Sequence, residues 1–179
     1  MHIPPYNNKN EPIININNHK VPLVYFNIIK LKTNEIYNSE VIGYETCFVP
    51  VTGSFKISVG NLNLENIGNR NKNVWDGEPE GVYIPVNEVA EIKCLSEDAE
   101  GFIAGAKFDQ KLKPFYIGNN DIDIVQYGSD DTKTHRKIKH ILGQKQADKV
   151  GRLLVSELYT VGQGGWSGFP PHKLSLIHI

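Results

Sequence analysis

The chain has 179 residues, of which 40% are hydrophobic and 22% are charged, and its formal net charge is −1 at pH 7. This length can build one domain with a hydrophobic core, or one domain and part of a second. The balanced charge argues against nucleic acid or an anionic membrane as a partner, because both attract proteins with an excess of positive charge.

The N-terminal residues MHIPPYNNKNEPI lack the basic and apolar regions of a signal peptide, and no apolar run is long enough to cross a bilayer. We therefore expect a cytoplasmic protein. Cys47 and Cys94 lie in different apolar segments. In a reducing compartment we expect both to be buried free thiols, although a disulfide is compatible with the sequence.

Short segments rich in β-branched and aromatic residues recur along the chain, and several alternate between apolar and polar residues, as β-strands do. In SFKISVG, Phe55, Ile57 and Val59 should all face the same way. A turn is expected at Thr52 and Gly53. The expected strands are VPLVYFNIIKLK (21–32), CFVPV (47–51), SFKISVG (54–60), VYIPV (82–86), EVAEIKCLS (88–96), EGFIAGAKF (100–108), DIDIVQYG (121–128) and GRLLVSELYT (151–160).

These strands are separated by turns rich in Gly, Asn and Asp, which favours an all-β sandwich or barrel. No long stretch has apolar residues at helical spacing, and residues 135–153 are expected to hold at most one short helical turn. The polar and basic segment from Ser129 to Gly151 is interpreted as the connection between one β unit and the next.

Three polar segments are candidate sites, each with a simpler alternative. In LENIGNR, Arg70 could bind an anion, but a tight turn with a surface arginine is the favoured interpretation. In THRKIKH, Arg136 could reach an anionic substrate, whereas a solvated connector accounts for the same residues. The acidic residues at 97, 98 and 100 are interpreted as a hairpin turn.

The segment GGWSGFPPHK differs from these because its prolines stiffen the chain directly before His172. A metal site on a strand would need a second histidine at position 174, on the same face, but that residue is leucine. From residue chemistry alone, His172 is a satisfied histidine more often than a metal ligand.

At these residues the sequence resembles a known family. SELYT followed by GGWSGFPPHK is similar to the 5-deoxy-glucuronate isomerases of bacterial myo-inositol catabolism. LENIGNR followed by VWDGEPEGVYIP, and RKIKHIL at residues 136–142, resemble other parts of that family. The resemblance extends from about Val21 to Lys173. It implies the N-terminal half of a two-cupin protein, in which each half is a small antiparallel β-barrel or jelly roll.

The resemblance also implies a site. His172 would be the first ligand of a divalent metal, expected to be zinc, whose other ligands lie in the second cupin. Arg136, Arg70 and Trp166 are the residues expected to contact the substrate or an interface, and the general base is not identified. With His172 as its only metal ligand, the chain is expected to be inactive and not to hold the metal. The intact protein is expected to be a homo-oligomer that acts on a uronic acid.

The resemblance ends abruptly at residue 174. The last six residues, LSLIHI, are the translation of a DNA string that resembles a sequencing adapter, so we expect residues 174–179 to be non-native. The alternative is a natural, divergent C-terminus. The expected domains are therefore an N-terminal cupin with its linker at residues 1–150, and the first strand of a second cupin at 151–173.

The expected function of the parent protein is the aldose–ketose isomerisation of 5-deoxy-glucuronate to 5-dehydro-2-deoxy-gluconate. Two alternatives stay open. One is a non-catalytic cupin that binds a sugar acid or serves in assembly, because the N-terminal part has no His-x-His motif of its own. The other is the related isomerase of 5-keto-4-deoxyuronate.

Overall fold

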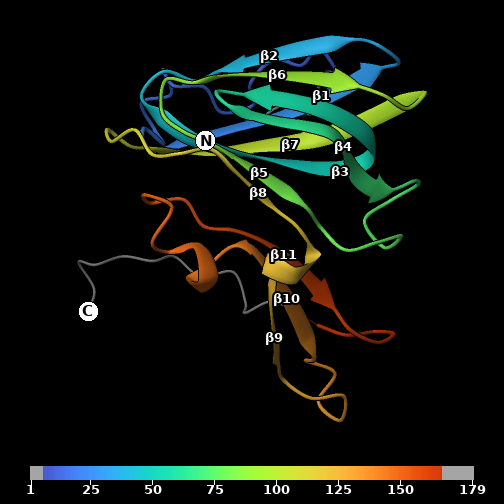
Figure 1. Ribbon diagram of the computed structural model, residues 1–179. Helices are drawn as coiled ribbons and strands as arrows, with labels where there is room; N and C mark the ends of the chain where they lie inside the picture. The colour runs from blue at the N-terminus through green and yellow to red at the C-terminus, as the bar shows by residue number, and fades with distance from the viewer. Residues whose placement is uncertain (1–5, 167–179) are drawn as a thin grey trace.

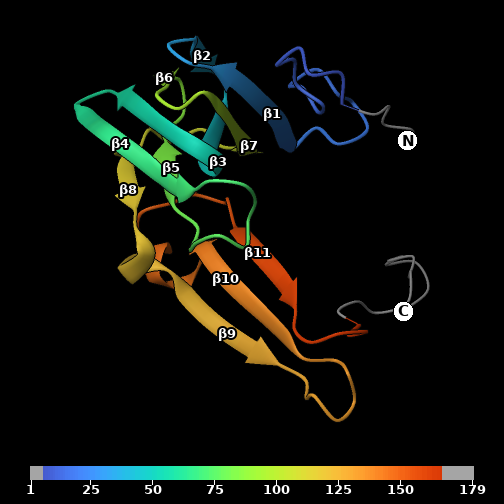
Figure 2. The same cartoon turned by 90° about the vertical axis from the view of Figure 1, so that its right-hand side faces the viewer.

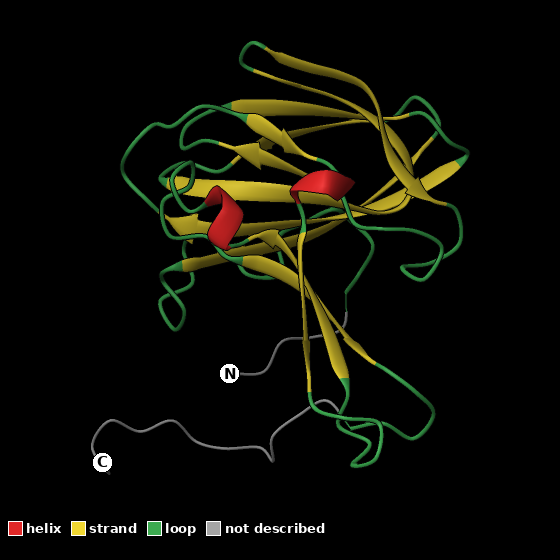
Figure 3. Cartoon of the chain, turned by 60° about the horizontal axis from the view of Figure 1, so that its bottom comes forward, coloured by secondary structure: helices red, strands yellow, loops and turns green. Residues whose placement is uncertain are grey.

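The computed structural model describes residues 6–166, and these form eleven strands and two short 3-10 helices (Figures 1 and 3). The strands are β1 (Val24–Lys32), β2 (Ile36–Glu40), β3 (Tyr44–Val59), β4 (Leu62–Arg70), β5 (Gly81–Ile84), β6 (Val89–Cys94), β7 (Asp98–Lys107), β8 (Phe115–Ile117), β9 (Asp123–Tyr127), β10 (Arg136–Leu142) and β11 (Val155–Thr160). The helices are η1 (Asn119–Asp121) and η2 (Gln144–Gln146).

The long strand β3 organises a sandwich of two antiparallel sheets. Its first part pairs with β7 and β5, which gives one sheet with the order β1-β7-β3-β5-β8. Its second part pairs with β4 and β6, and β6 pairs with β2, which gives the opposite sheet. The all-β, cupin-like fold expected from the sequence is therefore confirmed.

The turn expected at Thr52 and Gly53 is wrong, because β3 continues through both residues. Gly53 has a φ of +76°, and the register of β3 shifts against β7 and β4 on either side of it. A left-handed residue inside a strand bends the strand without reversing it. This bend lets one strand contribute to both sheets.

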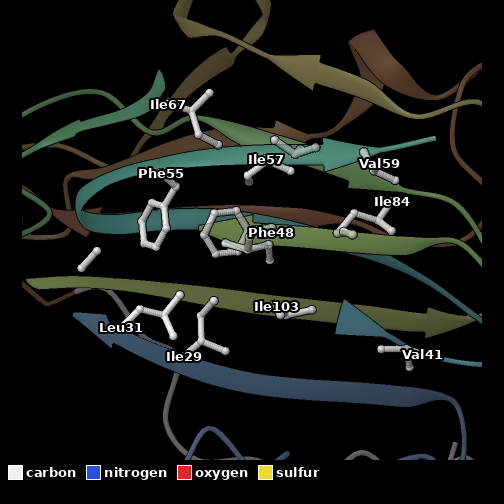
Figure 4. Close-up of a cluster of buried hydrophobic side chains, with 14 of the residues drawn as sticks. Ile29, Leu31, Val41, Phe48, Phe55, Ile57, Val59, Ile67, Ile84 and Ile103 are labelled. Carbon is white, nitrogen blue, oxygen red and sulfur yellow. The ribbon is translucent and has the colours of Figure 1, made fainter. Parts of the chain in front are cut away.

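The main core fills the space between the two sheets (Figure 4). Phe55, Ile57 and Val59 all point into it, as the alternation in SFKISVG predicts. The rings of Phe48 and Phe55 meet edge to face with their centroids 5.0 Å apart. The interior of the cupin-like barrel, which is the space between the two sheets of the sandwich, is thus occupied by packed apolar side chains.

A second core lies on the outer face of the sheet that contains β5. Phe48 points into the main core, whereas its neighbours Cys47 and Val49 point to the other face, because successive side chains of a strand alternate. There they pack with Ile141 and Leu142 of β10. Cys47 and Cys94 are both buried free thiols, as expected, and burial raises the pKa of Cys47 to about 12.

The second core joins the sandwich to a three-stranded antiparallel sheet with the order β11-β10-β9, which extends away from the sandwich (Figure 2). β10 begins inside THRKIKH, so the interpretation of those residues as a solvated connector is wrong; the longer segment 129–151, interpreted as a connection, contains this strand. The last two residues of β10, Ile141 and Leu142, are buried against the sandwich, and the pattern KIKHIL was too short and too basic to stand out. The proposed domain division at residue 150 stays a prediction.

A buried carboxylate fixes the chain between the two parts. Glu45 on β3 is fully buried and accepts hydrogen bonds from the backbone amides of residues 151, 152 and 153. It also accepts one from the hydroxyl of Tyr83, at 2.7 Å. Four donors therefore satisfy the charge of one side chain in the interior.

Within residues 6–166, no helix has the length and apolar character needed to span a membrane.

Candidate functional site

A cavity of about 350 Å³ lies between the loop that joins β4 to β5 and the three-stranded sheet. The loop contributes Trp75 and Glu78, β10 contributes Lys137 and Lys139, and β11 contributes Tyr159. The register of β10 against β11 explains why the side chains of these two strands meet. Lys137 is opposite Tyr159, and Lys139 is two residues further along the same face.

An ion pair that crosses the molecule supports this cavity from behind. The guanidinium of Arg70, at the end of β4, donates to both carboxylate oxygens of Glu157 on β11, each at 2.7 Å. The Arg70 side chain is only 2% exposed and Glu157 is 19% exposed. A fork-shaped pair in a dry environment holds both partners in one orientation.

The environment of this pair determines the ionisation of its members. Burial lowers the pKa of Arg70, but the hydrogen bonds and the charge of Glu157 outweigh this effect and raise that pKa overall. Burial and Glu157 together raise the pKa of Tyr159, whose hydroxyl donates to Glu157. Tyr159 therefore stays a neutral donor at physiological pH.

The two lysines of the cavity differ in their partners. The ammonium of Lys139 lies 2.7 Å from the carboxylate of Glu78 and 4.7 Å from the centre of the Tyr159 ring. Lys137 is half-buried, and none of the residues between 6 and 166 forms an ion pair or hydrogen bond with its ammonium. The cavity therefore contains one compensated and one uncompensated positive charge.

An exposed aromatic ring forms the outer wall. Trp75 is 70% exposed, and its indole meets the Tyr159 ring edge to face, with centroids 4.8 Å apart. This contact holds the indole in place while most of its surface stays open to solvent. An exposed, positioned indole is a common surface for packing the carbon skeleton of a ligand.

Of the predicted site residues, the three within residues 6–166 (Arg70, Arg136 and Trp166) do not line this cavity. Arg70 lies behind it and is engaged by Glu157; the favoured alternative of a surface arginine in a tight turn is wrong, because Arg70 is buried at the end of a strand. Arg136 begins β10 and, as a strand neighbour of Lys137, belongs to the opposite face. The backbone amide of Trp166 donates to the carbonyl of Lys133, and its side chain is 58% exposed.

His172 lies outside the described residues. The roles assigned to His172, Arg70, Arg136 and Trp166 stay predictions. The residues that sequence reasoning missed are Trp75, Lys137 and Glu157. In KIK, the alternation places Lys137 and Lys139 on one face of a strand, and in ELY it does the same for Glu157 and Tyr159. Nothing local to either segment indicates that these two strands pair with each other.

The described residues do not fit the expected metal. Residues 6–166 contain no group of three or more His, Cys, Asp or Glu side chains that could hold an ion. His135 contacts Asp130 and Gln126, and the ring of His140 contacts Ser156. Within the described part of the chain, the ligand set of the expected metal is therefore not found, and the metal stays a prediction.

Comparison with known proteins places this architecture in a family. A family model described as KduI/IolB matches residues 2–174. A 5-deoxy-glucuronate isomerase of Listeria monocytogenes is 30% identical over 161 residues, which cover 89% of this chain and 57% of the relative. A 5-deoxy-glucuronate isomerase of Bacillus subtilis has the same identity and coverage. The chain thus spans a little over half the length of these curated relatives.

Among solved structures, an IolB-like protein from Salmonella typhimurium LT2 superposes with a TM-score of 0.73 at 22% sequence identity. The match covers 84% of this chain and 55% of that one, and at this identity it supports the fold alone. The family model, in contrast, matches nearly the whole sequence and includes every strand of the structure. This chain therefore belongs to the KduI/IolB family.

Proposed function

We propose that this chain is part of an aldose–ketose isomerase that converts 5-deoxy-glucuronate to 5-dehydro-2-deoxy-gluconate. In this proposal the enzyme acts in inositol catabolism and is located in the cytoplasm. The observation that carries this proposal is the 30% identity, over 89% of the chain, to proteins named 5-deoxy-glucuronate isomerase. Because the chain spans 57% of those relatives, the activity is assigned to the intact protein and not to these residues alone.

The chemistry demands two things of the intact protein. A proton must move between adjacent carbons, which requires a positioned acid and base. A divalent metal, with zinc expected, would polarise the carbonyl and the neighbouring hydroxyl when bound. We assign His172 as one ligand of that metal; residues 6–166 do not provide the other ligands. What the described residues contribute is a packed scaffold and a cavity with cationic and aromatic walls.

A second candidate is a non-catalytic domain that binds a sugar acid or serves in assembly. Two observations favour it for the described part of the chain. The barrel interior is filled by apolar side chains such as Phe48 and Ile57, and the cavity lies outside the barrel. A domain of this kind would hold a ligand or another domain without carrying out the reaction.

The experiment is to express the protein encoded by the chromosomal reading frame that contains residues 1–173. Its isomerisation of 5-deoxy-glucuronate and of 5-keto-4-deoxyuronate is then measured beside the 179-residue chain. We expect turnover of the first substrate by the chromosomal protein, none by the 179-residue chain, and loss of metal and activity in His172→Ala. Preference for the second substrate supports the related isomerase. Absence of both activities in a folded chromosomal protein supports the non-catalytic domain.

A further inference from the structure

The uncompensated charge of Lys137 is the feature of the cavity that the fold does not explain. Lys139, two residues away on the same face, is neutralised by Glu78 at 2.7 Å. Arg70 behind them is neutralised by Glu157. Within the described part of the chain, Lys137 has no such partner, although it is half-buried beside the cavity. A half-buried ammonium is stabilised when an anion occupies the space in front of it.

The carboxylates of the cavity leave this space open to an external anion. Glu78 is committed to Lys139. Asp76, which also lines the cavity, accepts hydrogen bonds from the backbone amides of Lys72 and Asn73 within its own loop. Both carboxylates that line the cavity therefore have hydrogen-bond or ion-pair partners within the protein, and Lys137 is the group that remains for the carboxylate of a ligand.

The shape of the cavity limits the ligand. Its volume of about 350 Å³ is at the lower end of the range for small-molecule sites, about 300–1,000 Å³. Trp75 adds an open aromatic surface next to the charged wall. This combination suits a small acid with a carbon chain or ring.

We propose that this cavity binds a monocarboxylate sugar acid, with the ammonium of Lys137 paired to the carboxylate and the indole of Trp75 packed against the carbon skeleton. The Lys139–Glu78 pair and Tyr159 border the cavity and present polar atoms to hydroxyl groups. The choice of a sugar acid as the ligand class rests on the proposed function; the site itself rests on the geometry. Binding here does not require any chemical step.

Fluorescence can test this proposal with the 179-residue chain, because the chain has only two tryptophans. In a Trp166→Phe background, Trp75 is the single indole and reports directly on the cavity. We titrate this protein with D-glucuronate, with glucose as a neutral sugar, and with acetate as a carboxylate without a sugar skeleton. Glucuronate should give a saturable change with a dissociation constant on the order of 1 mM, and glucose and acetate should bind at least about tenfold more weakly.

Substitutions then identify the residues. Lys137→Gln should weaken glucuronate binding about tenfold, the loss expected for one charge-assisted contact, and Lys137→Arg should retain most of it. Lys20→Gln removes the same charge from an exposed position outside the cavity and should have no effect. A thermal melt of each variant confirms that it is folded. An equal response to glucose, unchanged affinity in Lys137→Gln, or no response to glucuronate would each overturn the proposal.

This test separates the site from the proposed isomerase. If the chromosomal protein isomerises 5-deoxy-glucuronate but Lys137→Gln leaves glucuronate affinity and KM unchanged, the site is wrong and the function stands. If no isomerisation is found but the 179-residue chain binds glucuronate through Lys137, the function is wrong and the site stands.

Discussion

Arg70 illustrates what a residue's immediate sequence can and cannot indicate. LENIGNR is rich in Asn and Gly, so local chemistry predicts a turn with an exposed arginine. The structure instead buries Arg70 against Glu157, which lies 87 residues further along the chain. The partner of a long-range ion pair leaves no trace in the neighbouring sequence. The sequence can predict that an arginine meets an anion here. It cannot predict that this anion is a carboxylate of the same chain.

The exposure of the two partners predicts an asymmetric cost when either one is removed. Glu157→Gln leaves the guanidinium of Arg70 charged and buried, and should lower the free energy of unfolding by about 3 kcal/mol. Arg70→Met leaves the more exposed Glu157, which water can reach, and should cost less. Urea denaturation measures both values. Glu65→Gln, which breaks an exposed pair with Lys56, is the control and should cost less than about 1 kcal/mol. Equal costs for Glu157→Gln and Glu65→Gln would contradict this account.

At the scale of elements, alternation predicted most strands well, but it missed the short strand β2 and divided β3 where that strand bends. Phe55, Ile57 and Val59 were placed on the correct face because a half-buried strand repeats every two residues. The continuous strand β3 was divided in two because a glycine before an alternating run is equally compatible with a turn and with a bend. Only the partners of the strand, which are distant in sequence, distinguish these cases.

Gly53 should therefore resist substitution more strongly than a glycine in an ordinary turn. A Cβ at this position would lie 2.5 Å from the carbonyl oxygen of Asp98 and 2.7 Å from Cβ of Ala99. Gly43 has the same φ of +76°, but a Cβ there meets nothing within 4 Å. Gly43→Ala should cost about 1–2 kcal/mol from backbone strain alone. Gly53→Ala should cost clearly more in thermal or urea unfolding, and similar values for the two variants would show that the bend tolerates a side chain.

At the scale of the whole molecule, the resemblance of several motifs predicted the cupin-like fold before any contact was known. It could not predict how the sandwich holds the three-stranded sheet. That attachment depends on Glu45, whose acceptors are filled by backbone amides 106 to 108 residues away. Backbone amides are present in every residue type except proline, so no pattern of side chains reveals them.

Glu45→Gln should loosen this attachment. The amide group of glutamine replaces one acceptor with a donor and leaves at least one buried N–H of residues 151–153 unsatisfied. We expect a loss of about 2–3 kcal/mol, and faster hydrogen exchange at these amides than elsewhere in the core. Tyr83→Phe removes a single donor to the same carboxylate and should cost about 1 kcal/mol without accelerating that exchange. Unchanged exchange in Glu45→Gln would show that the apolar contacts alone hold the segment.

The distance in sequence between Glu45 and its amide partners has a consequence for synthesis on the ribosome. At about 5–20 residues per second, about 5 to 20 seconds separate the translation of Glu45 from that of Gly151. Until β10 is made, Cys47 and Val49 of the nascent sandwich lack Ile141 and Leu142, which cover them in the finished fold, and until residues 151–153 follow, Glu45 lacks its three amide donors. A chaperone that recognises apolar strands would bind the nascent chain during this period. The chain would leave the chaperone once residues 151–153 are made and their amides bond to Glu45.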